Sequence, residues 1–177
     1  MTAIDHPHGR TRAPRHDAHR WLVLAALVVL CQAAGAIGIP FNERAVDSWY
    51  DTLDKPSFNP PSWVFGPVWT TLYLLMAVAA WLVWRSTDQR RRTALALFGV
   101  QLVANAAWSP LFFGARLPGW ALAELIVLWV LVATTLRWFA AIDRRAGALL
   151  VPYLAWVTFA GVLNARVWQL NPDQTAG

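Results

Sequence analysis

Five apolar stretches, each about 20 residues long, constrain the fold of this chain more than any other feature. They are residues 21–39, 62–84, 94–113, 120–139 and 147–168. A helix of about 20 residues crosses the roughly 30 Å of hydrocarbon in a bilayer, and most charged residues lie between the stretches. Composition agrees, since 57% of the residues are apolar and 14% are charged, against roughly 45–50% and about 25% in soluble domains. The sequence predicts an all-α integral membrane protein with five transmembrane helices in one bundle.

The segments outside these stretches differ in character. Residues 1–20 are a polar tail that holds all four histidines, and this composition favours a solvated tail over a metal site. Residues 40–61 form the longest connection, and residues 169–177 are a C-terminal tail. The long connection carries four aromatic residues, which are Phe41, Trp49, Tyr50 and Phe58. Because long ordered loops commonly cover binding sites, we expect a lid rather than a passive linker.

The first apolar stretch has an alternative interpretation as a cleaved signal peptide, because basic residues precede it. Its length and the absence of an A-x-A cleavage site favour a retained helix. Cys31 within it is the only cysteine. An internal disulfide and a cysteine metal site are therefore excluded, and we predict no metal site.

The basic residues predict an orientation. With the N-terminus inside, eleven Lys and Arg residues lie on the inner side, and Arg44, Lys55, Arg116 and Arg166 lie outside. The eleven are Arg10, Arg12, Arg15, Arg20, Arg85, Arg90, Arg91, Arg92, Arg137, Arg144 and Arg145. This bias predicts a cytoplasmic N-terminus and an outside C-terminus in the cytoplasmic membrane. It also accounts for the net charge of +5 without a nucleic-acid partner.

Aromatic and amide side chains share faces at helical spacing on three of the predicted helices. The groups are Trp69, Tyr73, Met76 and Ala80; Gln101, Asn105 and Trp108; and Tyr153, Trp156, Ala160 and Asn164. Unpaired amides are costly in hydrocarbon, so these faces should point inward. Amides commonly join helices, and for Gln101 that role is as good an explanation as a pocket. The whole set favours a pocket for a large, flat and mostly apolar molecule.

The predicted orientation places several of these residues at one depth. Trp69, Asn105, Trp108, Glu124 and Asn164 fall in the outer half of the bilayer, below the connection 40–61. Glu124 is the only acid within a predicted helix, which makes it a functional candidate. A solvated position near the membrane boundary is the alternative.

Prolines lie at several predicted helix ends. Pro60 and Pro61 suit the first turn of the second helix, where a missing N–H costs nothing. Pro67 is expected to kink that helix and turn Trp69 toward the pocket. Pro110 and Pro152 could open the third and fifth helices in the same way.

Three stretches resemble a known family in order and spacing. They are WYDTLDKPSFNPPSWVFGPVWTTLYLLMAVAAWLVWR, QLVANAAWSPLFFGARLPGWALAE and LLVPYLAWVTFAGVLN, within residues 49–164. They resemble the tryptophan-rich sensory protein, or translocator protein (peripheral-type benzodiazepine receptor), family. The resemblance implies a five-helix membrane receptor that binds porphyrins and, in animal members, cholesterol and benzodiazepine-site ligands. For bacterial relatives it implies stress or tetrapyrrole-linked regulation and often a homodimer.

The resemblance also implies site residues. The family's aromatic pair for porphyrin binding and light-dependent porphyrin breakdown falls on Trp69 and Trp156. Its other pocket positions fall on Trp49, Tyr50, Asn105, Trp108, Trp120, Glu124 and Ala160. The animal cholesterol segment reads ATVLNYYVWR, whereas this chain reads AGVLNARVWQ, with Ala165 and Gln169 in place of tyrosine and arginine. Sterol binding through that segment is therefore not expected, although a lipid or sterol partner elsewhere stays open.

Three functions remain open from the sequence. The leading one is a porphyrin-binding membrane receptor or sensor, with porphyrin as ligand and no required cofactor. The others are light-dependent porphyrin degradation that uses Trp69 and Trp156, and transport of tetrapyrroles or lipids. Transport lacks the internal repeat that is typical of transporters. No histidine lies in a predicted helix, so metal-free protoporphyrin should bind at least comparably to haem.

Overall fold

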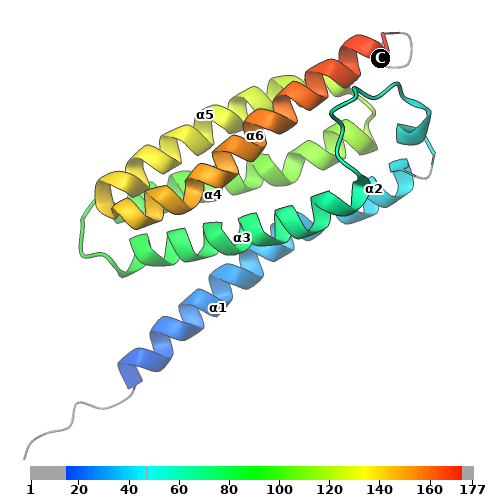
Figure 1. Cartoon of the computed structure of the whole chain (residues 1–177). Helices are drawn as coiled ribbons and strands as arrows, with labels where there is room; N and C mark the ends of the chain where they lie inside the picture. Colours follow the sequence, from blue (N-terminus) through cyan, green and yellow to red (C-terminus); the bar gives the residue numbers. More distant parts are fainter. Residues whose placement is uncertain (1–14, 47, 173–177) are drawn as a thin grey trace, which may run out of the picture.

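The computed structural model describes residues 15–46 and 48–172 (Figure 1). Their helices are α1 (Arg15–Ala36), α2 (Ile39–Val46), a 3-10 turn η1 (Tyr50–Thr52), α3 (Ser62–Arg85), α4 (Arg91–Ser109), a π-helical turn η2 (Pro110–Gly114), α5 (Pro118–Ile142) and α6 (Arg144–Leu170). Five helical spans in this part of the chain are long and apolar enough to cross a membrane. The predicted all-α, five-helix membrane fold is confirmed.

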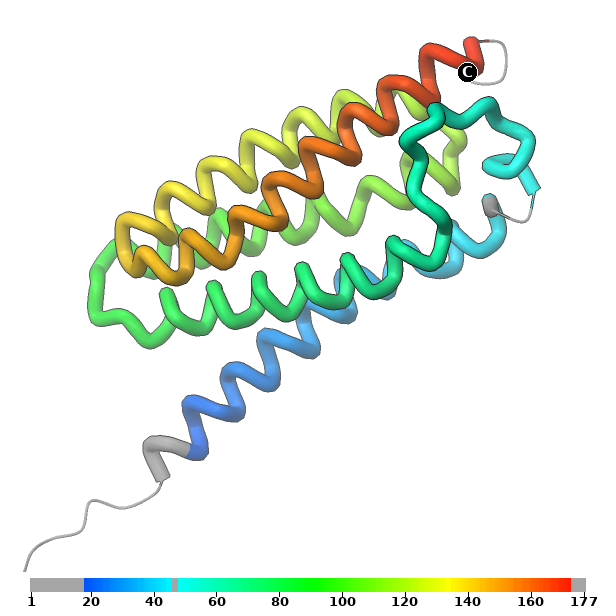
Figure 2. Tube along the Cα trace, viewed as in Figure 1, coloured from blue at the N-terminus to red at the C-terminus, as the bar shows by residue number. Residues whose placement is uncertain are grey.

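Helices α3 to α6 lie side by side along the bundle, and α1 packs against α3 and α4 (Figure 1). In Figure 2 the N-terminal half of α1 extends away from α5 and α6, and Trp21 and Leu22 there are 62% and 67% exposed. An exposed apolar helix surface suits a lipid environment. This half of α1 still contacts α3, because Trp81 Nε1 donates to Arg20 O at 2.9 Å and the rings of Trp21 and Trp81 stack with centroids 5.7 Å apart.

The bundle has two chemically different ends. The loop end holds α2, η1, residues 53–61, η2 and the end of α6 (Figure 1). The arginine end holds the α3–α4 and α5–α6 connections. Its arginines are Arg85, Arg90, Arg91, Arg92, Arg137, Arg144 and Arg145.

Close packing fills the bundle toward the arginine end. Met76, Ala77 and Ala80 have no exposed surface, and the rings of Phe98 and Phe139 stack with centroids 5.8 Å apart. Small residues allow the helices to approach closely here. A Cβ added at Gly147 would lie 2.8 Å from Ala140 Cα, which is backbone and cannot rotate away.

The predicted connection 40–61 is shorter than expected because its first part is helical. After a turn at residues 37–38, closed by the Gly38 N–H donating to Gly35 O at 3.1 Å, the chain resumes as α2. Ala45 on α2 is buried in a cluster with Trp49, Leu53 and Phe112. Tertiary packing at the loop end therefore stabilises a short helix that its polar sequence did not indicate.

The prolines also differ in part from expectation. The third helix, α3, begins at Ser62 after Pro61, so Pro60 and Pro61 precede the first turn. Helices α3 and α6 continue through Pro67 and Pro152, so the fifth span is not interrupted at Pro152. At Pro110 the α4 geometry does change, into the π-helical turn η2. A π-helical turn often marks a functional position, and η2 lies at the loop end.

Candidate functional site

A cavity of about 850 Å³ lies at the loop end. Every element from α2 to α6 contributes to it, together with the connection before α3. Its lining includes Tyr50, Phe65, Trp69, Tyr73, Asn105, Trp108, Phe112, Phe113, Leu125, Trp156, Phe159, Ala160 and Asn164. This volume is within the range of small-molecule sites, roughly 300–1,000 Å³.

Aromatic rings from different helices form the cavity walls. The ring centroids of Trp69 on α3 and Trp156 on α6 are 6.4 Å apart, and the planes meet at 87°. Trp69 also stacks on Tyr73, with centroids 5.4 Å apart and planes at 26°. On the opposite helix pair, Trp108 stacks on Phe112 at 5.0 Å. Rings in these orientations present both faces and edges, which suits a flat apolar ligand.

Buried amides connect the helices around the cavity. The Tyr73 hydroxyl donates to Asn105 Oδ1 at 2.6 Å, and the Tyr153 hydroxyl donates to Gln101 Oε1 at 3.0 Å. Each bond joins two helices, and all four side chains are nearly or fully buried. The prediction that these polar faces point inward is confirmed. Gln101 is 1% exposed and lies outside the cavity lining, so it joins helices, whereas Asn105 also lines the cavity.

Asn164 has the same double role. It accepts from Trp108 Nε1 at 3.3 Å and donates from Nδ2 to Pro118 O at 2.8 Å. It therefore fixes the Trp108 ring against the cavity and ties α6 to the start of α5. Its amide is 2% exposed, so both bonds are shielded from water.

Three buried polar groups have no hydrogen-bond partner among the described residues. They are Asn42 Oδ1, Gln101 Nε2 and both carboxyl oxygens of Glu124. Asn42 lines the cavity, but Glu124 does not, although Leu125 beside it does. The alternative interpretation, a solvated Glu124 near the membrane boundary, is wrong, since both carboxyl oxygens are shielded from solvent.

The structure brings together most of the residues implied by the family resemblance. Tyr50, Trp69, Asn105, Trp108, Trp156 and Ala160 line one cavity. Trp49 is buried outside it and packs edge-on against Phe112 at 6.0 Å, so it supports a cavity wall. Trp120 is 69% exposed, and neither it nor Glu124 belongs to the lining.

Several cavity residues were not assigned from the sequence. They are Asn42, Glu43, Asp51, Lys55, Asn59, Phe112 and Phe113, among others. The charged residues among them, Glu43, Asp51 and Lys55, lie in the connection 40–61 that was predicted to be a lid. That position was the only feature of the sequence that indicated a place beside the cavity. The Lys55 ammonium is 3.2 Å from Asp51 Oδ1 and 4.7 Å from the Tyr50 ring centroid. Burial raises the pKa of the Tyr50 hydroxyl, and the charge of Asp51 raises it further.

The connection before α3 is tied to the end of α6. The Asp54 backbone N–H donates to Asn171 Oδ1 at 2.8 Å, and Asn171 Nδ2 donates back to Asp54 O at 2.9 Å. These residues are 117 positions apart in sequence. The reciprocal pair holds residues 53–61 beside the cavity, where Asn59, Pro60 and Pro61 form part of its wall.

The first helix also alters the histidine prediction. It begins at Arg15 and not at residue 21, so His19, which was assigned to the polar tail, lies within the first candidate span, Ala18–Ala45. The His19 ring packs 5.7 Å from that of Trp84 at the arginine end. Trp84 is 15 residues beyond Trp69 on α3, about 22 Å along the helix. His19 is therefore remote from the cavity.

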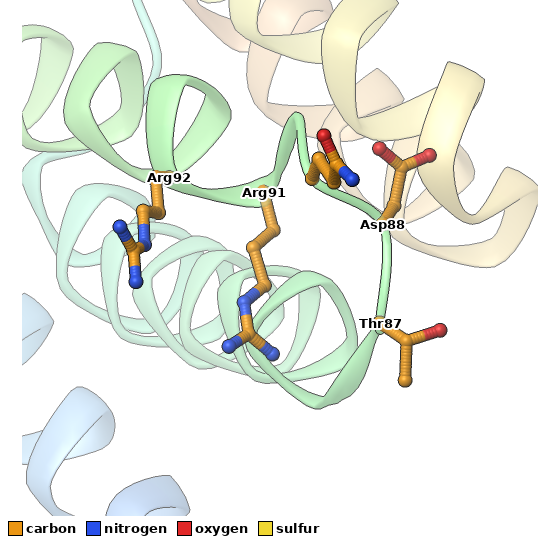
Figure 3. A pocket seen from close by; sticks show the side chains of 5 residues that line it. Thr87, Asp88, Arg91 and Arg92 are labelled. Carbon is orange, nitrogen blue, oxygen red and sulfur yellow. The ribbon is translucent and has the colours of Figure 1, made fainter.

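A second hollow, of about 560 Å³, lies on the α3–α4 connection and is lined by Thr87, Asp88, Gln89, Arg91 and Arg92 (Figure 3). Helix capping explains its side chains. Arg91 donates to Ser86 O at 2.7 Å at the end of α3. Asp88 accepts from Arg90 at 2.7 Å, and these hydrogen bonds lower the pKa of Asp88 to about 2. The hollow is an exposed surface turn, so the loop-end cavity is the candidate site.

Comparison with known proteins agrees with this architecture. A model of the TspO/MBR family matches residues 27–169. The chain is 41% identical over 155 residues to the tryptophan-rich protein TspO of Chlorobaculum tepidum, covering 85% of this chain and 97% of that relative. It is 40% identical over 151 residues to the tryptophan-rich sensory protein of Cereibacter sphaeroides, with 85% and 92% coverage. The translocator protein of Bos taurus is 36% identical over 160 residues, with 89% and 95% coverage.

Proposed function

Because the chain is a multi-pass membrane protein that belongs to the TspO/MBR family, we propose that it is a membrane receptor or sensor for porphyrins. The bound porphyrin occupies the aromatic cavity at the loop end and reports tetrapyrrole levels or stress. The relatives named as a sensory protein and a translocator protein support a sensing or ligand-handling role.

The observation that carries the proposal is the perpendicular pair of Trp69 and Trp156. Their centroids, 6.4 Å apart at 87°, offer a flat ligand one ring face and one ring edge within the same cavity. Stacked or edge-to-face aromatic contacts add about 0.5–1.5 kcal/mol beyond area burial. Asn105 and Asn164 supply nearby amide groups at the cavity surface.

Among the residues that the structure describes, the side chains that line the cavity include no histidine, cysteine or methionine. Haem iron is usually held by such residues or by tyrosine. Two tyrosines line the cavity, and both hydroxyls donate to amides: Tyr73 to Asn105 Oδ1 at 2.6 Å and Tyr50 to Asn59 Oδ1 at 3.3 Å. Binding should therefore depend on the flat ring system, and metal-free protoporphyrin should bind about as well as haem.

A titration in the dark tests the proposal. Purified protein in nanodiscs is mixed with protoporphyrin, and quenching of tryptophan fluorescence is followed. We expect saturation at one porphyrin per chain. Quenching that rises without saturation would indicate partition into the bilayer, and haem binding a hundredfold tighter than protoporphyrin would contradict a site without an iron ligand.

Trp120 is a position where the family resemblance and the structure disagree: the resemblance implies that it belongs to the pocket, but the structure places it outside the cavity lining. Its indole is 69% exposed and outside the lining, so Trp120→Phe should change the protoporphyrin dissociation constant by less than about twofold, within the scatter of neutral surface changes. The same titration measures it. A loss as large as that of a cavity tryptophan would mean that the ligand, or a second copy of the chain, reaches the outer face of α5.

Light-dependent degradation of the bound porphyrin is the second candidate, and the proximity of Trp69 and Trp156 favours it. Two indoles against a photoexcited ring are positioned to exchange energy or electrons with it. Illuminated protein with bound protoporphyrin should lose porphyrin absorbance faster than the Trp69→Phe/Trp156→Phe variant at equal occupancy. Equal rates would identify ordinary photobleaching.

The orientation in the membrane is part of the proposal. Seven arginines lie at the arginine end, whereas Arg44, Lys55, Arg116 and Arg166 lie toward the loop end. We expect the arginine end to face the cytoplasm and the cavity to open on the other side. In a Cys31→Ser background, Ser57→Cys should react with a membrane-impermeant maleimide in intact cells. Gln89→Cys should react only after permeabilisation, and the reverse pattern would overturn the orientation.

A further inference from the structure

The charges that line the cavity all lie at the loop end. They are Glu43 on α2, and Asp51 and Lys55 in the connection before α3. The other lining residues are aromatic, aliphatic, small or uncharged polar side chains. Within the described part of the chain, a ligand in this cavity therefore meets one positive charge, the Lys55 ammonium.

Lys55 lies at the end of a continuous aromatic wall. Its Nζ is 4.7 Å from the centroid of Tyr50. The Tyr50 ring is 5.4 Å from Phe113 and 6.2 Å from Phe112, and Phe112 stacks on Trp108 at 5.0 Å. A flat ligand against this wall would present its edge to the ammonium.

The ion pair of Lys55 with Asp51 leaves the ammonium available to bind a second carboxylate. Asp51 Oδ1 is 3.2 Å from Nζ, but the Asp51 side chain is 68% exposed, whereas that of Lys55 is 25% exposed. Such a pair contributes little, because the carboxylate stays hydrated. An ammonium has three donors, and among the described residues one of them has a hydrogen-bond acceptor, on Asp51. A second carboxylate can therefore bind without a strong bond being broken.

We propose that Lys55 binds a carboxylate on the edge of the ligand, so that the cavity selects flat apolar acids over their neutral counterparts. This inference rests on the proposed function, since it states where the carboxylate edge of the same ligand binds in the cavity. Glu43 and Asp51 work in the opposite direction. Their charges disfavour molecules with many carboxylates, which limits the preferred ligand to an acidic group on one edge.

Two probes that differ only in charge test the assignment. They are protoporphyrin, which has two carboxylates, and its dimethyl ester, which has none. Each is titrated in the dark into the full chain in nanodiscs. Lys55→Gln should weaken protoporphyrin about tenfold, as expected for loss of a charge-assisted hydrogen bond, and should leave the ester within about twofold.

Two further variants separate charge from shape. Lys55→Arg keeps the charge and should retain at least about half of the wild-type affinity for protoporphyrin. Asp51→Asn removes the competing carboxylate and should strengthen protoporphyrin binding about two- to fivefold, with no effect on the ester. A structural role of Lys55 in holding the connection would instead affect both probes equally.

The outcomes distinguish this inference from the proposed function. Saturable binding of both probes, with equal losses or no losses in Lys55→Gln, would overturn the role of Lys55 and leave the porphyrin cavity in place. If neither probe saturates, the proposed function fails and the inference fails with it. A charge-selective loss in Lys55→Gln, restored in Lys55→Arg, supports both.

Discussion

Replacing Trp69 and Trp156 together by phenylalanine is expected to weaken protoporphyrin binding about tenfold or more, a loss of roughly 1.4 kcal/mol. Phenylalanine keeps the apolar character of each position but removes the pyrrole ring of the indole, and with it part of the flat surface. Because the two rings meet at 87° within one cavity, the loss reduces both the face and the edge that a flat ligand contacts. The dark fluorescence titration in nanodiscs measures the change.

Trp63→Phe is the matched control for this prediction. Trp63 lies on the same helix as Trp69, is 74% exposed and is outside the cavity lining. It should leave the dissociation constant unchanged while removing one tryptophan fluorophore, against two in the double variant. If the double variant binds protoporphyrin as tightly as the wild type, the porphyrin occupies another site and the proposed function is wrong.

Gly147→Ala is expected to destabilise the folded bundle by about 1–3 kcal/mol, the usual cost of overpacking a core. The added methyl group would lie 2.5 Å from Ala140 Cβ and 2.8 Å from Ala140 Cα. Backbone atoms are among these neighbours, so α5 and α6 must move apart at the arginine end. Thermal unfolding in detergent, followed by circular dichroism, should show a midpoint several degrees lower, since about 1 kcal/mol corresponds to roughly 2–4 °C in a chain of this size.

Gly161→Ala is the control, because it makes the same chemical change on the same helix. A Cβ at Gly161 has no neighbour within 4 Å among the described atoms. Alanine also favours a helix interior over glycine by about 0.5–1 kcal/mol, so the midpoint should stay constant or rise. Equal destabilisation by the two changes would contradict a close contact between α5 and α6.

The five spans could be predicted from the sequence because lipid imposes a simple rule of length and apolarity. The inward-facing amides were predictable for the same reason, since an unpaired amide is costly in hydrocarbon. The helix α2 was not predictable in this way. Its eight residues, IPFNERAV, place the polar Asn42, Glu43 and Arg44 in consecutive positions, and their helical form depends on the cluster around Ala45 and Phe112.

The candidate site was predictable in its aromatic part and less so at its opening. Trp69 and Trp156 follow from helical spacing together with the family resemblance, and the cavity unites them. Trp120 has the same residue type but lies on the exposed face of α5, which spacing alone does not reveal. Lys55 comes from a connection whose path depends on distant contacts such as that between Asp54 and Asn171.

The packed core near the arginine end has a consequence for ligand kinetics. The core below the cavity is closely packed, and three of its residues have no exposed surface: Met76, Ala77 and Ala80. A ligand is therefore expected to enter and leave the cavity at the same end of the bundle, the loop end. Residues 53–61, which are attached to Asn171 and form part of the cavity wall, are then expected to affect the association rate and the dissociation rate together. Net flux of a tetrapyrrole across the bilayer would require this core to separate, at the free-energy cost of exposing close-packed side chains. A cavity that is closed toward the arginine end therefore fits the proposed role in sensing better than it fits transport.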